Sequence, residues 1–214
     1  MSLPADPFTL AQWRRAVGDM YAVVRQAPTA GQSRAWGAFL AARNRLFKTH
    51  PQSPLPPAER ALFSALDYYP YDPTWRVSGA LDREVAAEPL IVELPAEGTF
   101  RYTRVARVHF TVHGLQAALS VFWIEGYGGG LFLPFRDVSS GGTTYGGGRY
   151  LYDTIKGADL GAGSDAIMLD FNYAYNPSCA YDAQWVCPLS PPENRLPFPV
   201  EAGEKVFVPA TAEW

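Results

Sequence analysis

A run of alternating residues near the middle of the chain constrains the fold more than any other feature. In RVHFTVHG (107–114), Val108, Phe110 and Val112 alternate with polar side chains, and a period of two is the signature of a strand with one buried face. Gly114 then supplies a turn before the apolar run LQAALSVFWIEG (115–126). The two runs predict an antiparallel hairpin with strands at 106–113 and 116–124.

The rest of the chain after Trp75 has the same texture. Short β-branched and aromatic runs are separated by glycine, proline and aspartate, as in antiparallel sandwiches and barrels. The further predicted strands are 75–81, 89–94, 100–105, 130–135, 149–155, 166–171 and 205–208. We therefore expect residues 71–214 to form an antiparallel β-barrel or β-sandwich.

The first seventy residues read as helices. Asp6 followed by Pro7 predicts an N-cap with proline in the first turn. Two stripes of apolar residues then follow at helical spacing, the second after Ser33. They are Leu10, Trp13, Val17, Met20, Tyr21 and Val24, then Trp36, Phe39, Leu40, Leu46 and Phe47. The prolines of KTHPQSP (48–54) must end the second helix, and PPAERALFSALD (56–67) predicts a short third. We expect residues 1–70 to pack on the β-domain as one structural unit, in an α+β fold.

Composition narrows the range of partners. The 214 residues carry a net charge of −3 at pH 7, and no lysine or arginine run can neutralise several phosphates, so nucleic acid is not an expected partner. The chain shows neither a signal-peptide pattern nor the roughly 20 apolar residues of a membrane span. We therefore expect a cytoplasmic protein without a membrane partner, and leave its oligomeric state, a homodimer included, open.

The tract GGTTYGGGRYL (141–151) ends a run of glycines with a single arginine. Glycine lets another group approach the backbone closely, and a guanidinium can hold a carboxylate or phosphate through two parallel hydrogen bonds. We therefore expect this tract to bind an anionic ligand. The expected contacts are Tyr145, Gly147, Gly148 and Arg149. The alternative is a glycine-rich hairpin whose arginine pairs internally with Asp137 or Asp170.

A second candidate region, LDFNYAYNPSCAYDAQWVC (169–187), crowds short polar groups among aromatic rings. If residues 166–172 form a strand, Asp170 and Asn172 share a face roughly 7 Å apart, close enough to grip one small ligand. Asn176, Cys179 and Tyr181 follow directly and are expected to contribute to the same site. The alternative is a rigid loop whose Asn and Asp side chains cap backbone groups.

Three positions are candidates for acid–base catalysis: His50, Asp137 and Asp170. His50 falls at the end of the second predicted helix, where the helix carbonyls favour the protonated ring. A near-neutral pKa opposite a carboxylate would suit proton transfer. The alternative is that His50 only closes the helix.

The two cysteines, Cys179 and Cys187, are separated by seven residues. Structural zinc takes four ligands, with paired cysteines typically two to four residues apart, so we predict no metal and no other cofactor. In a reducing compartment the pair is expected as free thiols. A disulfide and a metal-stabilised interaction module built on the pair are the alternatives.

Five segments together resemble a known family. They are FKTHPQSPL, LDYYPYDPTWRV, FLPFRDVSSGGTTYGGGRYL, LDFNYAYNPSCAY and CPLSPPENRLPFPVEAGEK. Between about residues 45 and 205 the chain is similar to the bacterial domain-of-unknown-function family numbered one-six-eight-four. The resemblance implies that these segments belong to one functional pocket, and it adds Asn194 to the candidate ligand contacts. It implies no reaction.

These observations favour a small-molecule-binding β-barrel whose loops carry the site. We expect an enzyme acting on a carboxylate- or phosphate-bearing organic substrate, with hydrolysis, isomerisation and cyclisation all left open. A noncatalytic metabolite carrier or sensor is the main alternative. Acid–base groups facing the ligand separate the two, because a carrier has no use for them.

Overall fold

Three helices begin the structure, which is a computed structural model that describes residues 6–94 and 98–211. They are α1 (Pro7–Gln26), α2 (Gln32–Thr49) and α3 (Pro57–Leu62). The Asp6 side chain accepts hydrogen bonds from the backbone of Phe8 and Thr9, which confirms the predicted N-cap. Helix α2 begins one residue before Ser33 and ends before Pro51, as the proline run requires.

Seven strands form one antiparallel sheet, as the alternating pattern predicts. They are β1 (Arg76–Asp82), β2 (Pro89–Leu94), β3 (Gly98–Val112), β4 (Leu115–Ile124), β5 (Gly130–Phe135), β6 (Arg149–Asp153) and β7 (Ala166–Asp170). Their order across the sheet is β6-β5-β4-β3-β1-β7, and β2 pairs with β3 beside this path. The central hairpin β3–β4 turns at His113 and Gly114, both with positive φ (51° and 78°), as a two-residue hairpin loop demands.

Two strand predictions need correction. The predicted strands 100–105 and 106–113 are one long strand, β3, whose register shifts between Arg104 and Ala106. A bulge of this kind bends a strand without ending it. Residues 205–208 form no strand, because their backbone bonds to loops instead: Lys205 to Asp67 and Val206 to Thr143.

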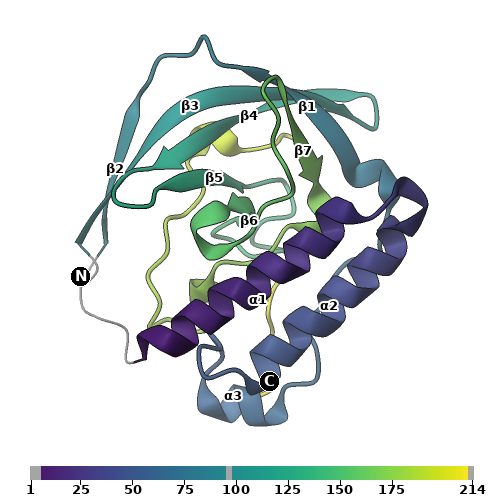
Figure 1. The fold of residues 1–214 in the computed structure, drawn as a ribbon, viewed down its shortest axis with the longest axis vertical. Helices are drawn as coiled ribbons and strands as arrows, with labels where there is room; N and C mark the ends of the chain where they lie inside the picture. Colours follow the sequence, from purple (N-terminus) through teal and green to yellow (C-terminus); the bar gives the residue numbers. More distant parts are fainter. Residues whose placement is uncertain (1–5, 95–97, 212–214) are drawn as a thin grey trace.

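The sheet curls into a half-barrel, with the helices across its open side (Figure 1). The outer strands β6 and β7 do not pair with each other in the described part of the chain. The segment between them bridges the gap, through backbone pairs Asp153–Ala158 and Ala162–Ile167. The structure therefore shows a curled antiparallel sheet with N-terminal helices, and not the closed barrel or two-layer sandwich that the sequence pattern allowed.

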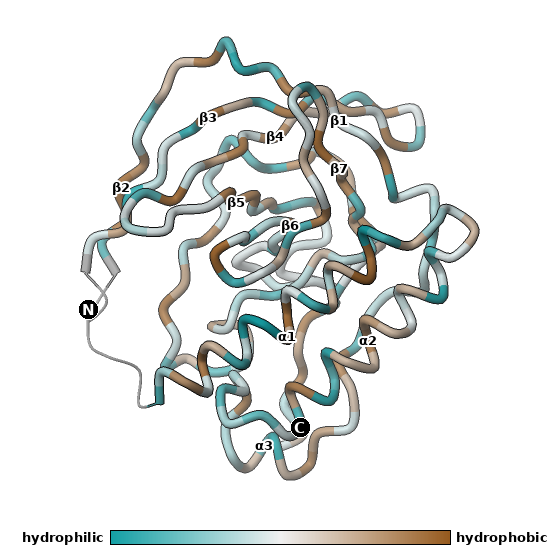
Figure 2. The backbone as a smooth tube through the Cα atoms, viewed as in Figure 1, coloured by the Kyte–Doolittle hydropathy of each residue, from teal (hydrophilic) through white to brown (hydrophobic). Residues whose placement is uncertain are grey.

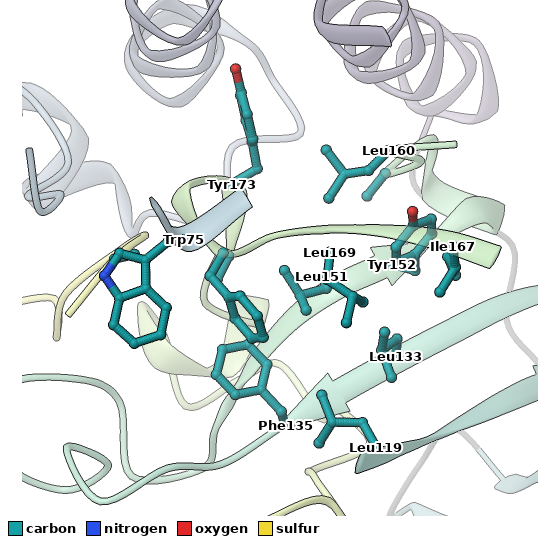
Figure 3. Close-up of a cluster of buried hydrophobic side chains, with 14 of the residues drawn as sticks. Trp75, Leu119, Leu133, Phe135, Leu151, Tyr152, Leu160, Ile167, Leu169 and Tyr173 are labelled. Carbon is teal, nitrogen blue, oxygen red and sulfur yellow. The ribbon is translucent and has the colours of Figure 1, made fainter. Parts of the chain in front are cut away.

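Helices and sheet share one hydrophobic core. Figure 2 shows hydrophobic and hydrophilic residues interleaved along α1 and α2, and the apolar face of each helix is buried against the sheet's inner residues. In Figure 3, Leu119, Leu133, Leu151 and Leu169 lie together, and all four are fully buried. Burying such a side chain stabilises the fold by about 1.5–3 kcal/mol.

Candidate functional site

Arg149 is the first residue of β6 and is 1% exposed. Its Nη2 donates to Asp137 Oδ2 at 2.9 Å and to the Val200 carbonyl at 3.0 Å. Its Nη1 donates to the carbonyls of Ala202 and Glu204. Internal acceptors thus occupy the terminal donors of the guanidinium. This corrects the expectation that Arg149 holds an anionic ligand, because the structure has the internal pair that was the alternative.

Both carboxylate oxygens of Asp137 are also bound by other groups of the protein. Its Oδ1 accepts hydrogen bonds from the backbone of Ser139 at 2.7 Å and of Val200 at 3.3 Å, and from the Ser139 hydroxyl. Its Oδ2 faces Arg149. With both oxygens bound and the residue 1% exposed, Asp137 organises the loop, and it lines neither of the cavities described below.

Gly147 and Gly148, which precede Arg149, allow close packing of this loop against its neighbours. A Cβ on Gly147 would lie 2.4 Å from a ring carbon of Tyr145. Gly148 has φ +92°, and a Cβ there would lie 2.6 Å from the Phe135 carbonyl oxygen. Both glycines therefore let the loop lie tightly on its neighbours, so they do not open the backbone to a ligand as we expected.

Asp170 and Asn172 lie together, but not on one strand. Strand β7 ends at Asp170, and residues 171–173 form a 3₁₀ turn. The Asn172 amide donates to Asp170 Oδ1 at 2.8 Å and exchanges two hydrogen bonds with the Asp72 backbone. Asp170 Oδ2 lies 3.3 Å from Arg76 Nε. The pair therefore tethers the start of β1.

Burial raises the pKa of Asp170 to about 6, and hydrogen bonds from Asn172 and the charge of Arg76 offset this only in part. A carboxyl with such a pKa suits proton transfer. Asp170 does not line either of the cavities described below. Its perturbed pKa therefore reflects a buried structural contact.

Asn194 also binds backbone. Its Oδ1 accepts a hydrogen bond from Ser120 N at 2.7 Å, and its Nδ2 donates to the carbonyls of Ser120 and Pro134 at 2.9 and 2.7 Å. All three partners belong to β4 and β5, so this side chain fixes a C-terminal loop to the sheet. Both of its amide N–H donors are used within the protein, the residue is fully buried, and it lines neither cavity.

His50 closes α2, as its position predicts. Its Nδ1 accepts a hydrogen bond from Gln52 N at 3.1 Å, and its ring meets Trp13 edge-on at 5.3 Å. Burial lowers the pKa of His50, opposite to the effect expected from the helix end. His50 does not line either cavity.

A cavity of about 60 Å³ lies between the helix pair and the β6 edge of the sheet. Its walls come from both helices, from β6 and the turn after it, and from the segment 175–181. The lining residues are Trp13, Val17, Tyr21, Arg43, Phe47, Pro54, Tyr150, Lys156, Ala158, Tyr175, Asn176, Pro177, Ser178 and Tyr181. Of the residues predicted for a ligand site, Asn176 and Tyr181 are among them.

Three buried polar atoms of the lining residues have no hydrogen-bond partner among the residues described. They are Tyr21 Oη, Arg43 Nε and Asn176 Oδ1. Buried polar groups are nearly always satisfied by protein or by bound molecules. These atoms come from α1, α2 and the C-terminal loops, so three residues with unpartnered buried polar atoms, from distant segments of the chain, line one cavity.

Arg43 and Glu204 organise the wall of this cavity. Arg43 Nη2 donates to Glu204 Oε2 at 3.0 Å and to Tyr181 Oη at 3.2 Å, and its guanidinium lies over the rings of Phe47 and Tyr175 at 4.7 and 5.1 Å. Glu204 Oε2 also accepts from Tyr68 Oη at 3.2 Å and from the Asn176 backbone at 3.1 Å, and Tyr181 donates to its Oε1.

Neither Arg43 nor Glu204 was among the site residues predicted from the sequence. A signal existed for Arg43, which lies four residues from both Phe39 and Phe47 and so falls on the apolar stripe of its helix. An arginine there must be buried and paired. Glu204 lies in a loop without periodicity, and no comparable signal marks it.

A second opening, a groove of about 330 Å³, lies near the β3–β4 turn. Its lining residues are Asp72, Trp75, Val112, His113, Leu115, Phe198, Pro199 and Glu201. His113 Nε2 is 2.7 Å from the Thr74 hydroxyl, which in turn donates to Asp72 at 2.6 Å. None of the residues predicted for a ligand site lines this groove.

Tyr145, Cys179 and Cys187 form a separate cluster. The Tyr145 hydroxyl is 3.6 Å from Cys179 Sγ, and the Cys179 backbone N–H donates to Cys187 Sγ at 3.4 Å. Both cysteines are free thiols and partly exposed. In the described ranges, no group of three or more His, Cys, Asp or Glu residues is placed to hold a metal ion.

A comparison with known protein families finds a match for this chain. A family model described as "Protein of unknown function (DUF1684)" matches residues 61–205. The match includes four of the five segments that carry the resemblance and begins after FKTHPQSPL and His50. Over the described residues, no helix is both long and apolar enough to cross a membrane.

The chain is also similar to a solved structure. It is the solution NMR structure of the uncharacterized protein from gene locus rrnAC0354 of Haloarcula marismortui, with 37% sequence identity and a TM-score of 0.56. The similarity covers 79% of this chain and 91% of that chain. No curated protein matches. With more than half of its length matched by the family model, the chain belongs to the DUF1684 family.

Proposed function

We propose that the protein binds a small organic molecule in the helix–sheet cavity. A carboxylate or similar acceptor group of the ligand takes hydrogen bonds from Arg43 Nε and Tyr21 Oη, and a donor group of the ligand bonds to Asn176 Oδ1. The observation that carries the proposal is that three residues lining one cavity each have a buried polar atom without a partner among the described residues. A ligand that bonds all three would remove the cost of leaving them unpaired.

The size and lining of the cavity favour such a ligand. One water needs roughly 10–15 Å³ of such space, so about 60 Å³ accommodates several waters or a molecule of a few non-hydrogen atoms. Aromatic rings of Trp13, Phe47, Tyr150 and Tyr175 supply apolar contact. Few polar groups among many apolar ones are typical of small-molecule sites.

The charges near the cavity favour an anionic group on the ligand. Lys156 is half-exposed and lies 3.4 Å from Asp153 Oδ2, whose charge raises the pKa of Lys156. Arg43 is paired with Glu204 through Nη2, which leaves Nε as a charge-assisted donor. Such hydrogen bonds are stronger than neutral ones.

The residues that line the cavity are better suited to binding a ligand than to catalysing a reaction. None of the fourteen lining residues is a His, Asp, Glu or Cys. Burial raises the pKa of Tyr21 and of Tyr150, and Lys156 is held in its charged form. No lining group therefore titrates near neutral pH, as a general acid or base would, and we favour a carrier or sensor over the enzyme expected from the sequence.

The variant Tyr21→Phe tests the proposal, with Tyr173→Phe as its matched control. Both tyrosines are buried with unpartnered hydroxyls, but Tyr173 does not line the cavity, and Figure 3 shows its hydroxyl pointing toward the helices. Each variant deletes one oxygen at a similar depth. Only Tyr21→Phe removes a proposed ligand contact.

Native mass spectrometry of freshly purified protein would look for a retained small molecule, and NMR titration with formate and acetate would supply affinities. We expect binding to weaken roughly tenfold in Tyr21→Phe, about one hydrogen bond, and to stay unchanged in Tyr173→Phe. Equal weakening in both variants, or no retained molecule and no response to either acid, would reject the proposal in favour of a water-filled cavity.

A further inference from the structure

The two cysteines are arranged as a reactive pair. The backbone N–H of Cys179 donates to the sulfur of Cys187 at 3.4 Å, and the Tyr145 hydroxyl lies 3.6 Å from the sulfur of Cys179. Both cysteines are free thiols and are partly exposed. The cluster lies outside the cavity, and it depends neither on the ligand nor on the function proposed above.

The surroundings make the two thiols unequal. The neighbouring Cys187 thiol lowers the pKa of Cys179 to about 6, with a further contribution from Tyr145 and with burial opposing. The interaction with Cys179, together with burial, raises the pKa of Cys187. At neutral pH the pair therefore holds one thiolate and one thiol, as in dithiols where one sulfur attacks and the other resolves.

We propose that Cys179 and Cys187 form a peroxide-reactive dithiol, in which Cys179 attacks the peroxide and Cys187 closes a disulfide. The Cys179 sulfur bonds to one peroxide oxygen, the O–O bond breaks, and the leaving oxygen takes a proton, giving a sulfenic acid and water or an alcohol. The Cys187 sulfur then loses its proton and attacks the sulfenic sulfur. An S–S bond forms, the S–O bond breaks and water leaves.

Two thiols are thus oxidised and one peroxide is reduced. Loss of the negative charge on Cys179 also removes the main reason for the raised pKa of Cys187. The first step therefore prepares the second sulfur to attack. Metal binding is the rival use of paired cysteines, but it needs further ligands, and no group of three candidates exists within the described residues.

The chain has only two cysteines, which makes the test unambiguous. Full-length reduced protein is treated with one equivalent of hydrogen peroxide and its intact mass is measured. We expect the wild type to lose the mass of two hydrogens without dimerising. Cys187→Ser should instead accumulate a sulfenic acid at Cys179 that dimedone traps, and Cys179→Ser should react at least tenfold more slowly.

The pH profile of iodoacetamide alkylation, measured on the wild type, needs no variant. The thiolate fraction at pH 7 rises from roughly 3% for an ordinary thiol to about 90% at a pKa of 6, but the nucleophilicity of each thiolate falls. The rate gain is therefore small, and the position of the inflection is the informative quantity. We expect it near pH 6, and Tyr145→Phe should move it upward.

Three results would overturn the proposal. They are an inflection near pH 8.5, equal peroxide reactivity in Cys179→Ser and the wild type, and oxidation of the wild type that gives only intermolecular disulfides. A purely structural pair of buried thiols predicts the first two of these results.

Discussion

Two buried arginines of this protein do different work, although each pairs with a carboxylate. Arg149 binds Asp137 and three backbone carbonyls, and it lies inside the loops that close the sheet. Arg43 binds side chains, Glu204 and Tyr181, between two aromatic rings. Each has an Nε without a partner among the described residues, but only that of Arg43 belongs to a residue lining a described cavity.

The difference shows that a conspicuous motif can be structural, while an inconspicuous helix residue can line a cavity. The glycine tract around Arg149 is what a chain needs to fold a loop tightly over a buried ion pair. Arg43 is one polar residue on a helix stripe, yet its surroundings leave a donor at a cavity. The predictions below test whether the first arginine stabilises the fold and the second prepares a site.

The largest effect is expected for Arg149→Met. The substitution leaves Asp137 Oδ2 as part of a buried, unpaired charge and takes the donor from three backbone carbonyls, and breaking a buried pair in this way costs about 3–5 kcal/mol. Urea denaturation should show this loss in the free energy of unfolding. In Asp137→Asn/Arg149→Met the charge is absent, so the double variant should be more stable than Arg149→Met alone. A single variant within about 1 kcal/mol of the wild type would contradict the structural role.

Asp170→Asn tests a third buried carboxylate, whose arginine partner is partly exposed. The folded pKa of about 6 lies above the unfolded value of about 3.9. Between these values the folded state binds more protons, so stability falls as pH rises from about 4 to 6 and remains lower above. Two pKa units correspond to about 3 kcal/mol.

The variant keeps an oxygen to accept the hydrogen bonds from Asn172 but cannot ionise. Relative to the wild type, Asp170→Asn should therefore gain about 2–3 kcal/mol between pH 4 and pH 7, measured by urea denaturation at each pH. A difference that does not vary over this range would mean that the carboxyl titrates as an exposed group does.

Much of the fold followed from periodicity. The alternation around Val108 predicted β3 and β4, and the helical stripes predicted α1 and α2, because burial acts on every residue of an element at once. The closure of the sheet could not be predicted. It depends on which outer strands pair, and here a loop spans from β6 to β7.

The site was harder to predict, because polar residues in loops have several uses that the sequence does not separate. Asn176 and Asn194 are both buried asparagines in C-terminal loops. The side chain of Asn194 bonds to β4 and β5 through its oxygen and its amide nitrogen, whereas Asn176 lines the cavity and its side-chain oxygen has no partner among the described residues. Only tertiary contacts distinguish them.

Arg43→Met should cost less than Arg149→Met, about 2 kcal/mol. Glu204 loses its ion pair, but both of its carboxylate oxygens keep hydrogen bonds, from Tyr68, Tyr181 and the Asn176 backbone. In Arg149→Met, by contrast, Asp137 Oδ2 loses its arginine donor. Arg43→Lys preserves the charge and lacks the Nε donor, so it should keep most of the stability and lose ligand affinity. Equal destabilisation by Arg43→Met and Arg149→Met would remove the distinction between the two arginines.

The smallest effect is expected for His50→Asn, which separates a predicted catalytic residue from the cavity residues. Asparagine keeps an acceptor for the Gln52 backbone N–H and loses only the edge contact with Trp13. Because burial lowers the pKa of His50, protonation favours the unfolded state, so the wild type should lose a little stability as pH falls through the folded pKa, and the variant should not. Thermal melts from pH 7 to 5 measure this difference.

Ligand affinity should be the same in His50→Asn and the wild type, since His50 does not line the cavity. A loss of affinity comparable to that in Arg43→Lys would place the functional site at the C-terminal end of α2.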